Sequence, residues 1–396
     1  MEPTSAPDLD HTNSAMLAPP PDPPERAIPA TGSPPPDSTE RWKAWDRFLE
    51  ATPETGFMQS SWWAEFRLAA GYEHFAAILK HRNAIVGGAV VMKFSVTPQS
   101  CFYYVPDGPV LPPDESAAGE VFAAILEAIE DRRKTEAQMV SHLRIEPRWQ
   151  RLPGFVRGFR SVAEFTDKYS EPRNTLWIDL LASEEGILAQ MKPKGRYNIR
   201  VAQRHCVKVV EDTSAQGLAD FLSIYQAMAA HQGIQPKSAS YFEDLVSTLW
   251  SAQKGSFFFA EYQGARLAAA LVVYFGKRAT YFFGGSLNHH RHVMAPYLLH
   301  FEIMRRAKAL GFAEYDLWGV APAEQSDHPW GEISVFKRKF GGVELKLVPT
   351  LDYDYDAAAY AQYLAGQRDS GDKGFRASLS SPSTSSPENM NEICAR

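Results

Sequence analysis

The fold is decided by residues 256–318, which read SFFFAEY (256–262), ARLAAALVVYFG (265–276), RATYFFGGS (278–286), MAPYLLHFEIMRRAKAL (294–310) and EYDLW (314–318). The first three segments are short and rich in aromatic and β-branched residues, which is typical of strands. The fourth is long enough for a helix, and the fifth returns to strand character. This order predicts an α/β domain in which neighbouring strands lead into a helix and then a further strand.

The same order of elements occurs upstream. We expect strands at 74–80, 84–95 and up to Pro106, a helix at 116–136 and a strand at 141–145. The second copy begins with a strand at 174–180, one helix from Glu184 to about His205, a strand at 207–211 and helices at 215–231 and 238–253. Repetition of element order predicts a duplicated domain. We therefore expect domains at 41–170 and 171–345, with 346–364 returning to the first.

Both ends of the chain differ in composition from its centre. Residues 1–40 contain eleven of the 28 prolines and no aromatic residue, and residues 378–387 read SLSSPSTSSP. Such segments cannot bury enough apolar surface to fold. We expect disordered tails at 1–40 and 365–396. The acids at Asp352, Asp354 and Asp356 alternate with two tyrosines, Tyr353 and Tyr355, which we interpret as an exposed edge strand without chemistry.

The charge and the cysteine content of the chain limit the classes of function and the cellular location that we expect. The net charge of −6 disfavours a nucleic-acid partner, but residues 171–345 hold 19 basic against 17 acidic residues. Three cysteines far apart indicate neither a disulfide framework nor a cysteine metal site. No charged segment leads into an apolar run at the start, and the apolar run at 267–275 is too short to span a bilayer. We expect a cytoplasmic protein.

A series of basic residues follows the strand at 174–180. Lysines and arginines recur every four residues, with Lys194 among them and no acid, at Lys192, Arg196, Arg200, Arg204 and Lys208. On one helix, begun by Pro193, they form a basic stripe. One interpretation is a solvated helix face, and the other is a surface that contacts phosphates. The absence of acids favours the second, so we expect activity to fall steeply with added salt.

Residues 336–342, FKRKFGG, form a short helix with Phe336 and Phe340 on one face and Gly341 at its end. The simplest interpretation of Lys337, Arg338 and Lys339 is that they offset the helix dipole.

Three histidines, His289, His290 and His292, lie one and two residues apart in the sequence, with no carboxylate between them. We therefore expect no metal site there.

The chain resembles the FemABX family of peptidoglycan bridge-forming aminoacyltransferases, which carry two tandem GNAT-like acyltransferase domains. The resemblance rests on eight segments in order: QSSWW (59–63) with Arg67, YVPDGP (104–109), LRIEP (143–147), 192–207, 281–285, AP (295–296), YDLWG (315–319) and 336–341. It implies an α/β fold with mixed sheets. It also implies transfer of an amino acid from aminoacyl-tRNA, as co-substrate without further cofactor, to the stem peptide of a nucleotide- or lipid-linked precursor.

The resemblance also implies roles for individual residues. Lys337 would stabilise the negative charge of the tetrahedral intermediate, and Phe336 would stack on the terminal adenosine of the tRNA. Arg67 would contact the precursor or be a surface cation beside two tryptophans. Tyr281 would face the cleft or the core. Asp316 would pair with Lys337 or cap its strand. The precursor or tRNA would contact Lys192, Arg196 and Arg200.

Three departures from related patterns matter. The family's Tyr-Val-Pro-Arg-Gly-Pro has Asp107 in place of arginine, and its Thr-x-x-Arg corresponds to residues 228–231, which end in His231. In acyl-CoA enzymes of the GNAT fold, the loop before the helix is rich in glycine, whose backbone amides hold a pyrophosphate. Here that loop, residues 290–296, has no glycine, and Pro296 lacks an amide donor.

Two other functions remain open from the sequence. One is an N-acyltransferase that uses acyl-CoA or another activated acyl group on a non-peptidoglycan amine. The other is a non-catalytic module that binds precursor or tRNA. A lipid-linked acceptor would bring the protein to the inner face of the plasma membrane as a peripheral protein.

Overall fold

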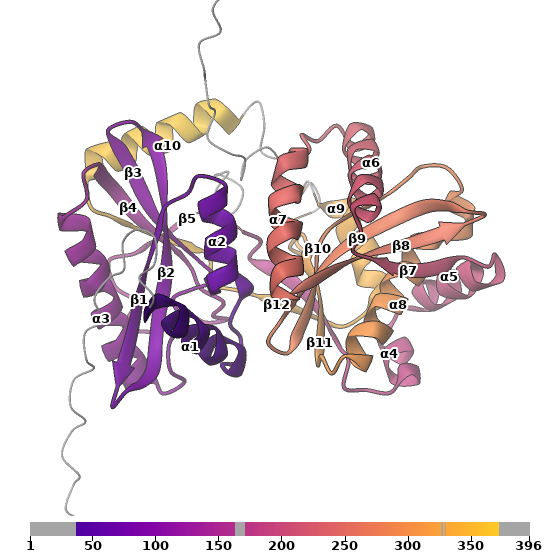
Figure 1. Ribbon diagram of the computed structural model, residues 1–396, viewed down its shortest axis with the longest axis horizontal. Helices are drawn as coiled ribbons and strands as arrows, with labels where there is room; N and C mark the ends of the chain where they lie inside the picture. The colour runs from indigo at the N-terminus through magenta and orange to yellow at the C-terminus, as the bar shows by residue number, and fades with distance from the viewer. Residues whose placement is uncertain (1–36, 163–170, 326–327, 329, 372–396) are drawn as a thin grey trace, which may run out of the picture.

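The computed structural model describes residues 37–162, 171–325, 328 and 330–371, which form two α/β domains side by side (Figure 1). The expected fold class is confirmed. Most of the two expected tails lies outside the described residues. The tail boundaries are wrong by a few residues, because helix α1 begins at Asp37 (Asp37–Ala51) and helix α10 continues to Gly371 (Ala357–Gly371).

The first domain is built on a six-stranded sheet in the order β1-β2-β3-β4-β13-β5. Its strands are β1 (His74–His81), β2 (Ala84–Thr97), β3 (Ser100–Pro106), β4 (Met139–Glu146), β5 (Arg160–Val162) and β13 (Thr350–Asp354). Alternate residues of each strand face opposite sides of the sheet. One side packs on helix α3 (Glu115–Lys134), and the other packs on α1, the short helix η1 (Phe57–Gln59) and α2 (Ser61–Ala69).

The second domain is built on a seven-stranded sheet in the order β12-β6-β11-β10-β9-β8-β7. Its strands are β6 (Asn174–Asp179), β7 (Lys208–Asp212), β8 (Gly255–Tyr262), β9 (Ala265–Phe275), β10 (Arg278–Ser286), β11 (Glu314–Gly319) and β12 (Val343–Lys346). Its helices are α4 (Glu184–Gln190), α5 (Pro193–Arg204), α6 (Ala215–Gln232), α7 (Ala239–Ala252), η2 (Arg291–Val293), α8 (Ala295–Ala309), α9 (Gly331–Lys337) and η3 (Arg338–Phe340). None of the helices in the described part of the chain is long and apolar enough to cross a membrane.

Aromatic side chains join the two domains into one core. The ring of Phe57 from the first domain lies 5.2 Å from Phe282 and 5.9 Å from Trp318 of the second. Trp63 also approaches Phe282, at 5.9 Å. One hydrophobic cluster therefore runs from α1 and α2 into α6, α7 and β10, and α2 packs directly against α7. Residues on the facing sides of both domains are held at fixed positions relative to one another.

The helix expected from Glu184 to about His205 is two helices, α4 and α5. The break falls at Met191 and Lys192, whose backbones are extended (ψ 148° and 150°). Proline disfavours helical geometry in the residue that precedes it, so Pro193 ends one helix and begins the next. Lys192 is consequently the N-cap of α5, and Lys208 lies on β7 instead of continuing the basic stripe.

Strand β13 is not the exposed edge strand that its alternating acids indicated. It lies between β4 and β5, and α10 (yellow in Figure 1) crosses the same domain. Asp352 is fully buried and accepts hydrogen bonds from Arg144 Nε (2.8 Å), Arg144 Nη2 (2.7 Å) and the Tyr360 hydroxyl (2.9 Å). This bidentate pair attaches the end of the chain to the first domain, after the chain has passed through the second domain.

We expect Asp352→Asn to lower the free energy of unfolding by about 3–5 kcal/mol, because it leaves the buried Arg144 guanidinium without its counter-charge. Urea denaturation of the two proteins measures the difference. The matched control is Asp354→Asn, two residues further on, whose partner Arg160 is 58% exposed. That exposed pair contributes at most about 1 kcal/mol. Equal effects of the two substitutions would contradict this account.

Candidate active site

Two parallel strands of the second domain separate and leave an opening between them. Strands β10 and β11 pair only at Arg278↔Glu314, Ala279↔Tyr315 and Thr280↔Asp316. Beyond these pairs β10 continues beside β9, and β11 continues beside β6. In the first domain the equivalent parallel strands, β3 and β4, stay paired to their ends at Pro106↔Glu146. Among the described residues, only the second domain therefore has such an opening.

Lys337 lies at this opening. Its Nζ donates a hydrogen bond to the carbonyl oxygen of Gly319 (2.7 Å), at the end of β11, and lies 5.7 Å from the ring of Tyr281 on β10. The side chain is buried. Burial lowers the pKa of Lys337 to about 7, although the negative charge of Asp316 acts in the opposite direction. The lysine is not one of the exposed cations that merely offset a helix dipole.

His300 of α8 is a buried neighbour of Lys337 that the sequence analysis did not identify. Its ring lies 4.7 Å from Tyr281 and 5.5 Å from Phe336, and Nδ1 is 2.8 Å from the Tyr315 hydroxyl. Burial, assisted by the charge of Lys337, lowers the pKa of His300 to about 3. The imidazole is therefore neutral at physiological pH and leaves Lys337 as the cation at this point. A single histidine on the apolar face of a helix does not stand out in the sequence, so its place beside Lys337 could not be predicted.

Phe336 and Tyr281 combine core packing with proximity to the opening. Phe336 is half-buried and packs against Tyr297 (5.1 Å between ring centroids) and Phe340 (5.3 Å). Tyr281 packs against the hydrophobic cluster beneath α8, while its ring faces Lys337.

Gly341 has a φ of 74°, and a side chain there would collide with the Gln190 carbonyl, so the turn after η3 requires glycine.

Asp316 lies within β11, at the last residue of this strand that pairs with β10. Its Oδ1 accepts hydrogen bonds from the Trp318 amide (2.8 Å) and from the Thr175 hydroxyl. Its Oδ2 lies 3.6 Å from Nη2 of Arg148, which comes from the first domain. No ion pair joins Asp316 and Lys337 within the described residues, so Asp316 acts on the lysine through its field. Arg148 also approaches Asp107, with 3.4 Å between Nη1 and Oδ1.

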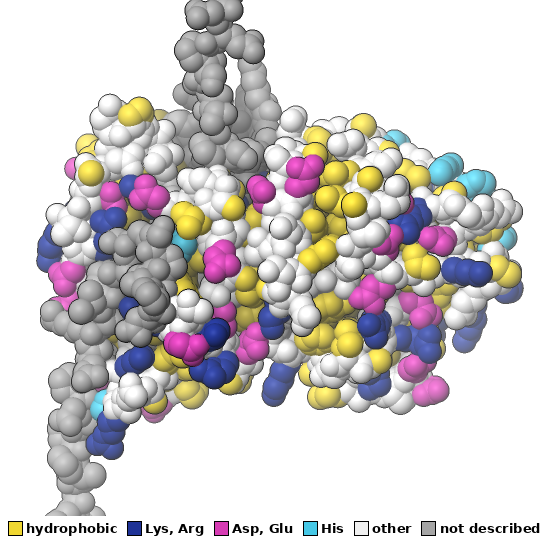
Figure 2. Space-filling view, in the orientation of Figure 1, with side chains coloured by type: hydrophobic (Ala, Val, Ile, Leu, Met, Phe, Trp, Pro, Cys, Tyr) yellow, Lys and Arg dark blue, Asp and Glu magenta, His cyan; other side chains and the backbone are white. Residues whose placement is uncertain are grey.

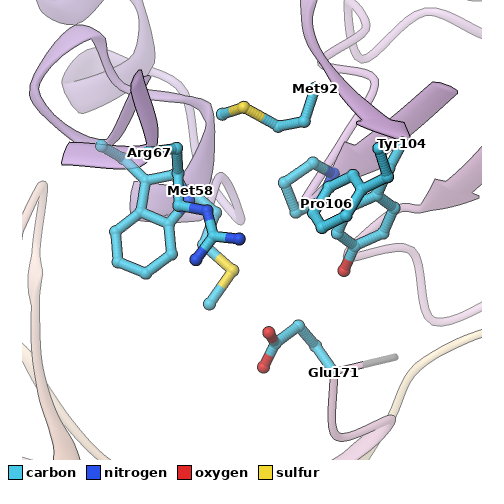
Figure 3. Close-up of a pocket in the computed structure, with 8 residues that line it drawn as sticks. Met58, Arg67, Met92, Tyr104, Pro106 and Glu171 are labelled. Carbon is cyan, nitrogen blue, oxygen red and sulfur yellow. The ribbon is translucent and has the colours of Figure 1, made fainter. Parts of the chain in front are cut away.

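Arg67 lies in a separate small pocket between the domains (Figure 3). It is 2% exposed, and its guanidinium lies over the ring of Tyr72 at 4.0 Å, while Nη1 and Nη2 have no hydrogen-bond partner. It is therefore not a surface cation. Figure 3 shows the Arg67 guanidinium and the Glu171 carboxylate facing the same space from different segments. The free volume there is only about 10 Å³.

Two further charged groups influence this pocket. Burial, together with the nearby carboxylates of Glu146 and Asp107, raises the pKa of Glu171 to about 8. Burial lowers the pKa of Lys237 to about 8, against the opposing effect of Glu171. Lys237 follows α6 and was not identified from the sequence, whereas the predicted His231 is exposed in the last turn of α6. Among the described residues, no contact is seen between His231 and any other residue predicted for the site.

Helix α5 presents a basic surface. Lys192, Lys194, Arg200 and Arg204 are exposed, while Arg196 is half-buried and donates a hydrogen bond to the Met191 carbonyl. Figure 2 shows lysine and arginine side chains at the end of the molecule where Figure 1 places α5. On the neighbouring helix α8, by contrast, Arg305 pairs with Glu184 and Glu302, and Arg306 pairs with Glu211.

The loop before α8 has an unusual backbone. His290 and Met294 have positive φ angles of 55° and 57°, and Pro296 occupies the first turn of the helix. Cβ atoms therefore lie where acyl-CoA enzymes of this fold have glycine, and one amide donor is missing. His289, His290 and His292 lie close together here. Within the described residues no group of three or more histidines, cysteines and acids is arranged to hold a metal ion.

Comparisons with known proteins match both domains. Residues 41–151 match the FemAB family model, and residues 193–330 match the acetyltransferase (GNAT) domain model. The chain is 23% identical over 342 residues to the UDP-N-acetylmuramoylpentapeptide-lysine N(6)-alanyltransferase of Weissella viridescens, covering 83% of this chain and 96% of that protein. It is 21% identical over 395 residues to the lipid II:glycine glycyltransferase of Staphylococcus saprophyticus subsp. saprophyticus, covering 80% and 92%.

The fold comparison agrees. The crystal structure of FemX superposes with a TM-score of 0.74 at 17% sequence identity, and the match covers 82% of this chain and 98% of that one. The two domain models match in the order of the domains, and the relatives are covered over nearly their full length. The chain is therefore similar to transferases of the FemABX family across both of its tandem GNAT-like domains.

Proposed function

We propose that this protein transfers an aminoacyl group from aminoacyl-tRNA to an amine on the stem peptide of a peptidoglycan precursor. The observation that carries the proposal is the buried Lys337 amine at the opening between β10 and β11. Support comes from the relatives named as a glycyltransferase acting on lipid II and an alanyltransferase acting on a nucleotide-linked lysine. A lipid-linked acceptor would place the reaction at the inner face of the plasma membrane.

The chemistry requires little beyond positioning and charge stabilisation. The acceptor amine attacks the ester carbonyl carbon, a C–N bond forms, and the carbonyl oxygen becomes negative. Collapse breaks the C–O bond to the tRNA ribose, whose oxygen receives the proton that the amine loses. The ammonium of Lys337, in a water-poor site, stabilises the negative oxygen. Removal of such a donor typically costs about 10²-fold or more in rate.

The other predicted residues fit binding roles. Arg67, together with Lys237, which was not predicted from the sequence, supplies positive charge between the domains, where the phosphates of the precursor would bind. The basic surface of α5 would contact the phosphates of the tRNA. The loop before α8 lacks the glycine-rich backbone that holds a pyrophosphate, which disfavours acyl-CoA as the donor.

We expect Lys337→Met to reduce transfer by about 10²-fold or more, because the negative oxygen loses its positive partner. Folding should be retained, since the substitution removes a charge that burial disfavours. Single-turnover transfer from charged tRNA to purified precursor measures the rate, and circular dichroism checks the fold. A matched control is Lys339→Met, two residues away on η3. Unchanged transfer by Lys337→Met would remove the lysine from the mechanism.

The pH dependence of transfer gives a second measurement on Lys337. The attacking amine must be neutral, so the rate should rise tenfold per pH unit at low pH. Above about pH 7, the value to which burial lowers the pKa of Lys337, loss of its proton offsets this gain and the profile should become level. The residual rate of Lys337→Met should keep rising. A wild-type rate that climbs with unit slope from pH 7 to 9 would contradict this role.

The basic surface of α5 predicts a change in salt dependence. We expect Arg200→Gln with Arg204→Gln to weaken tRNA binding and to reduce the slope of log affinity against log salt by roughly 1.5, because two phosphate contacts are lost. The matched control is Arg305→Gln with Arg306→Gln, since these exposed arginines already pair with carboxylates. Filter binding at several salt concentrations measures both slopes. Identical slopes in the two double variants would exclude α5 as the contact surface.

A further inference from the structure

The first domain contains a large cavity outside the sites described above. It has a volume of about 910 Å³ and is formed by three loops, residues 52–55 after α1, 107–115 before α3 and 148–155 after β4. Its walls include Pro109, Pro112, Trp149 and Phe155, so much of the surface is apolar and rigid. This volume is large enough for a ligand of several hundred daltons.

Arg148 lies at the inner end of the cavity and is 7% exposed. Its Nη1 is 3.4 Å from Asp107 Oδ1, and its Nη2 is 3.6 Å from Asp316 Oδ2. Both distances exceed the roughly 2.7–2.9 Å of a charge-assisted hydrogen bond. Its Nε and Nη2 have no hydrogen-bond partner. A buried guanidinium with unused donors is costly to leave unsatisfied, which points to a ligand that completes its bonding.

The charges around the cavity select the kind of ligand. Arg148 and Arg151 are its cations, whereas Asp107, Glu54 and Glu115 are its carboxylates. A phosphate dianion would be repelled by the three carboxylates. A peptide end that combines one carboxylate with amide or ammonium donors matches both signs. The apolar walls suit small side chains and peptide backbone.

We propose that this cavity binds the carboxylate end of a short peptide, with Arg148 and Arg151 as the carboxylate ligands. The inference rests on the proposed function in one respect, because it identifies that peptide as the tail of the acceptor stem. The location suits this role. Arg148 lines the cavity, its Nη2 lies 3.6 Å from Asp316 Oδ2, and the charge of Asp316 acts on Lys337.

Peptide binding to the full-length protein, without tRNA, tests the proposal. The probes are acetyl-Lys-D-Ala-D-Ala with a free carboxylate and the same peptide with a C-terminal amide, titrated by calorimetry. We expect the carboxylate form to bind about tenfold more tightly or better, because it makes charge-assisted hydrogen bonds that the amide cannot. Pyrophosphate should not displace it. Equal affinities for the two forms, or displacement by pyrophosphate, would overturn the proposal.

Substitutions of residues that line the cavity test whether the peptide binds there. Arg151→Gln at the exposed rim and Arg148→Gln at the inner end should each bring the ratio of the two affinities close to one. Arg157→Gln is the matched control, an exposed arginine of the following residues that does not line the cavity. Gly154→Trp should weaken both peptides, because a side chain there points into open space. If Arg148→Gln does not fold, Arg151→Gln decides. An unchanged ratio in Arg151→Gln contradicts the assignment.

This test separates the inference from the proposed function. If the free carboxylate is required for binding but charged tRNA yields no product, the subsite stands and the transferase assignment fails. If the protein aminoacylates both peptides with equal efficiency, the assignment stands and the subsite is wrong.

Discussion

The contact between the aromatic rings of Phe57, Phe282 and Trp318 is the constraint on which the rest of the structure depends. It makes one hydrophobic core out of two domains and therefore fixes the distance between their facing loops. Arg148 of the first domain reaches Asp316 of the second only because of this packing.

The two domains have similar order but have diverged in one structural detail. In the second domain, the parallel strands β10 and β11 separate after three residue pairs, and the side chain of Lys337 lies at the opening between them. In the first domain, β3 and β4 remain paired. The buried carboxylate of Glu146 at their end accepts hydrogen bonds from the hydroxyls of Tyr104 and Thr350. The Glu146 carboxylate is thus satisfied by groups of the first domain. In our proposal the first domain contributes binding surface, and the second contributes the ammonium of Lys337.

Incompletely satisfied buried charges mark the functional regions of this molecule. Arg144 and Asp352 form a complete bidentate pair and serve stability. Arg67 and Arg148 are also buried, yet each has guanidinium nitrogens without a hydrogen bond. Such groups are rare in folded proteins, because an unsatisfied buried donor destabilises the fold by about 1–3 kcal/mol. Their retention is understandable if a ligand supplies the missing bonds, as we propose for both arginines.

The sequence by itself determined the α/β class and the duplicated order of elements, and it indicated Lys337 as a candidate, because periodicity and motif order are local properties. Local patterns failed where distant segments interact. Alternating acids at 352–356 predicted an exposed strand, but pairing with β4 buried Asp352. Only the tertiary structure showed that Lys337 is buried beside His300, that Lys237 lies in the field of Arg67 and Glu171, and that Arg148 lies between Asp107 and Asp316. Each of these depends on the packing of segments far apart in the chain, which fixes burial and therefore charge.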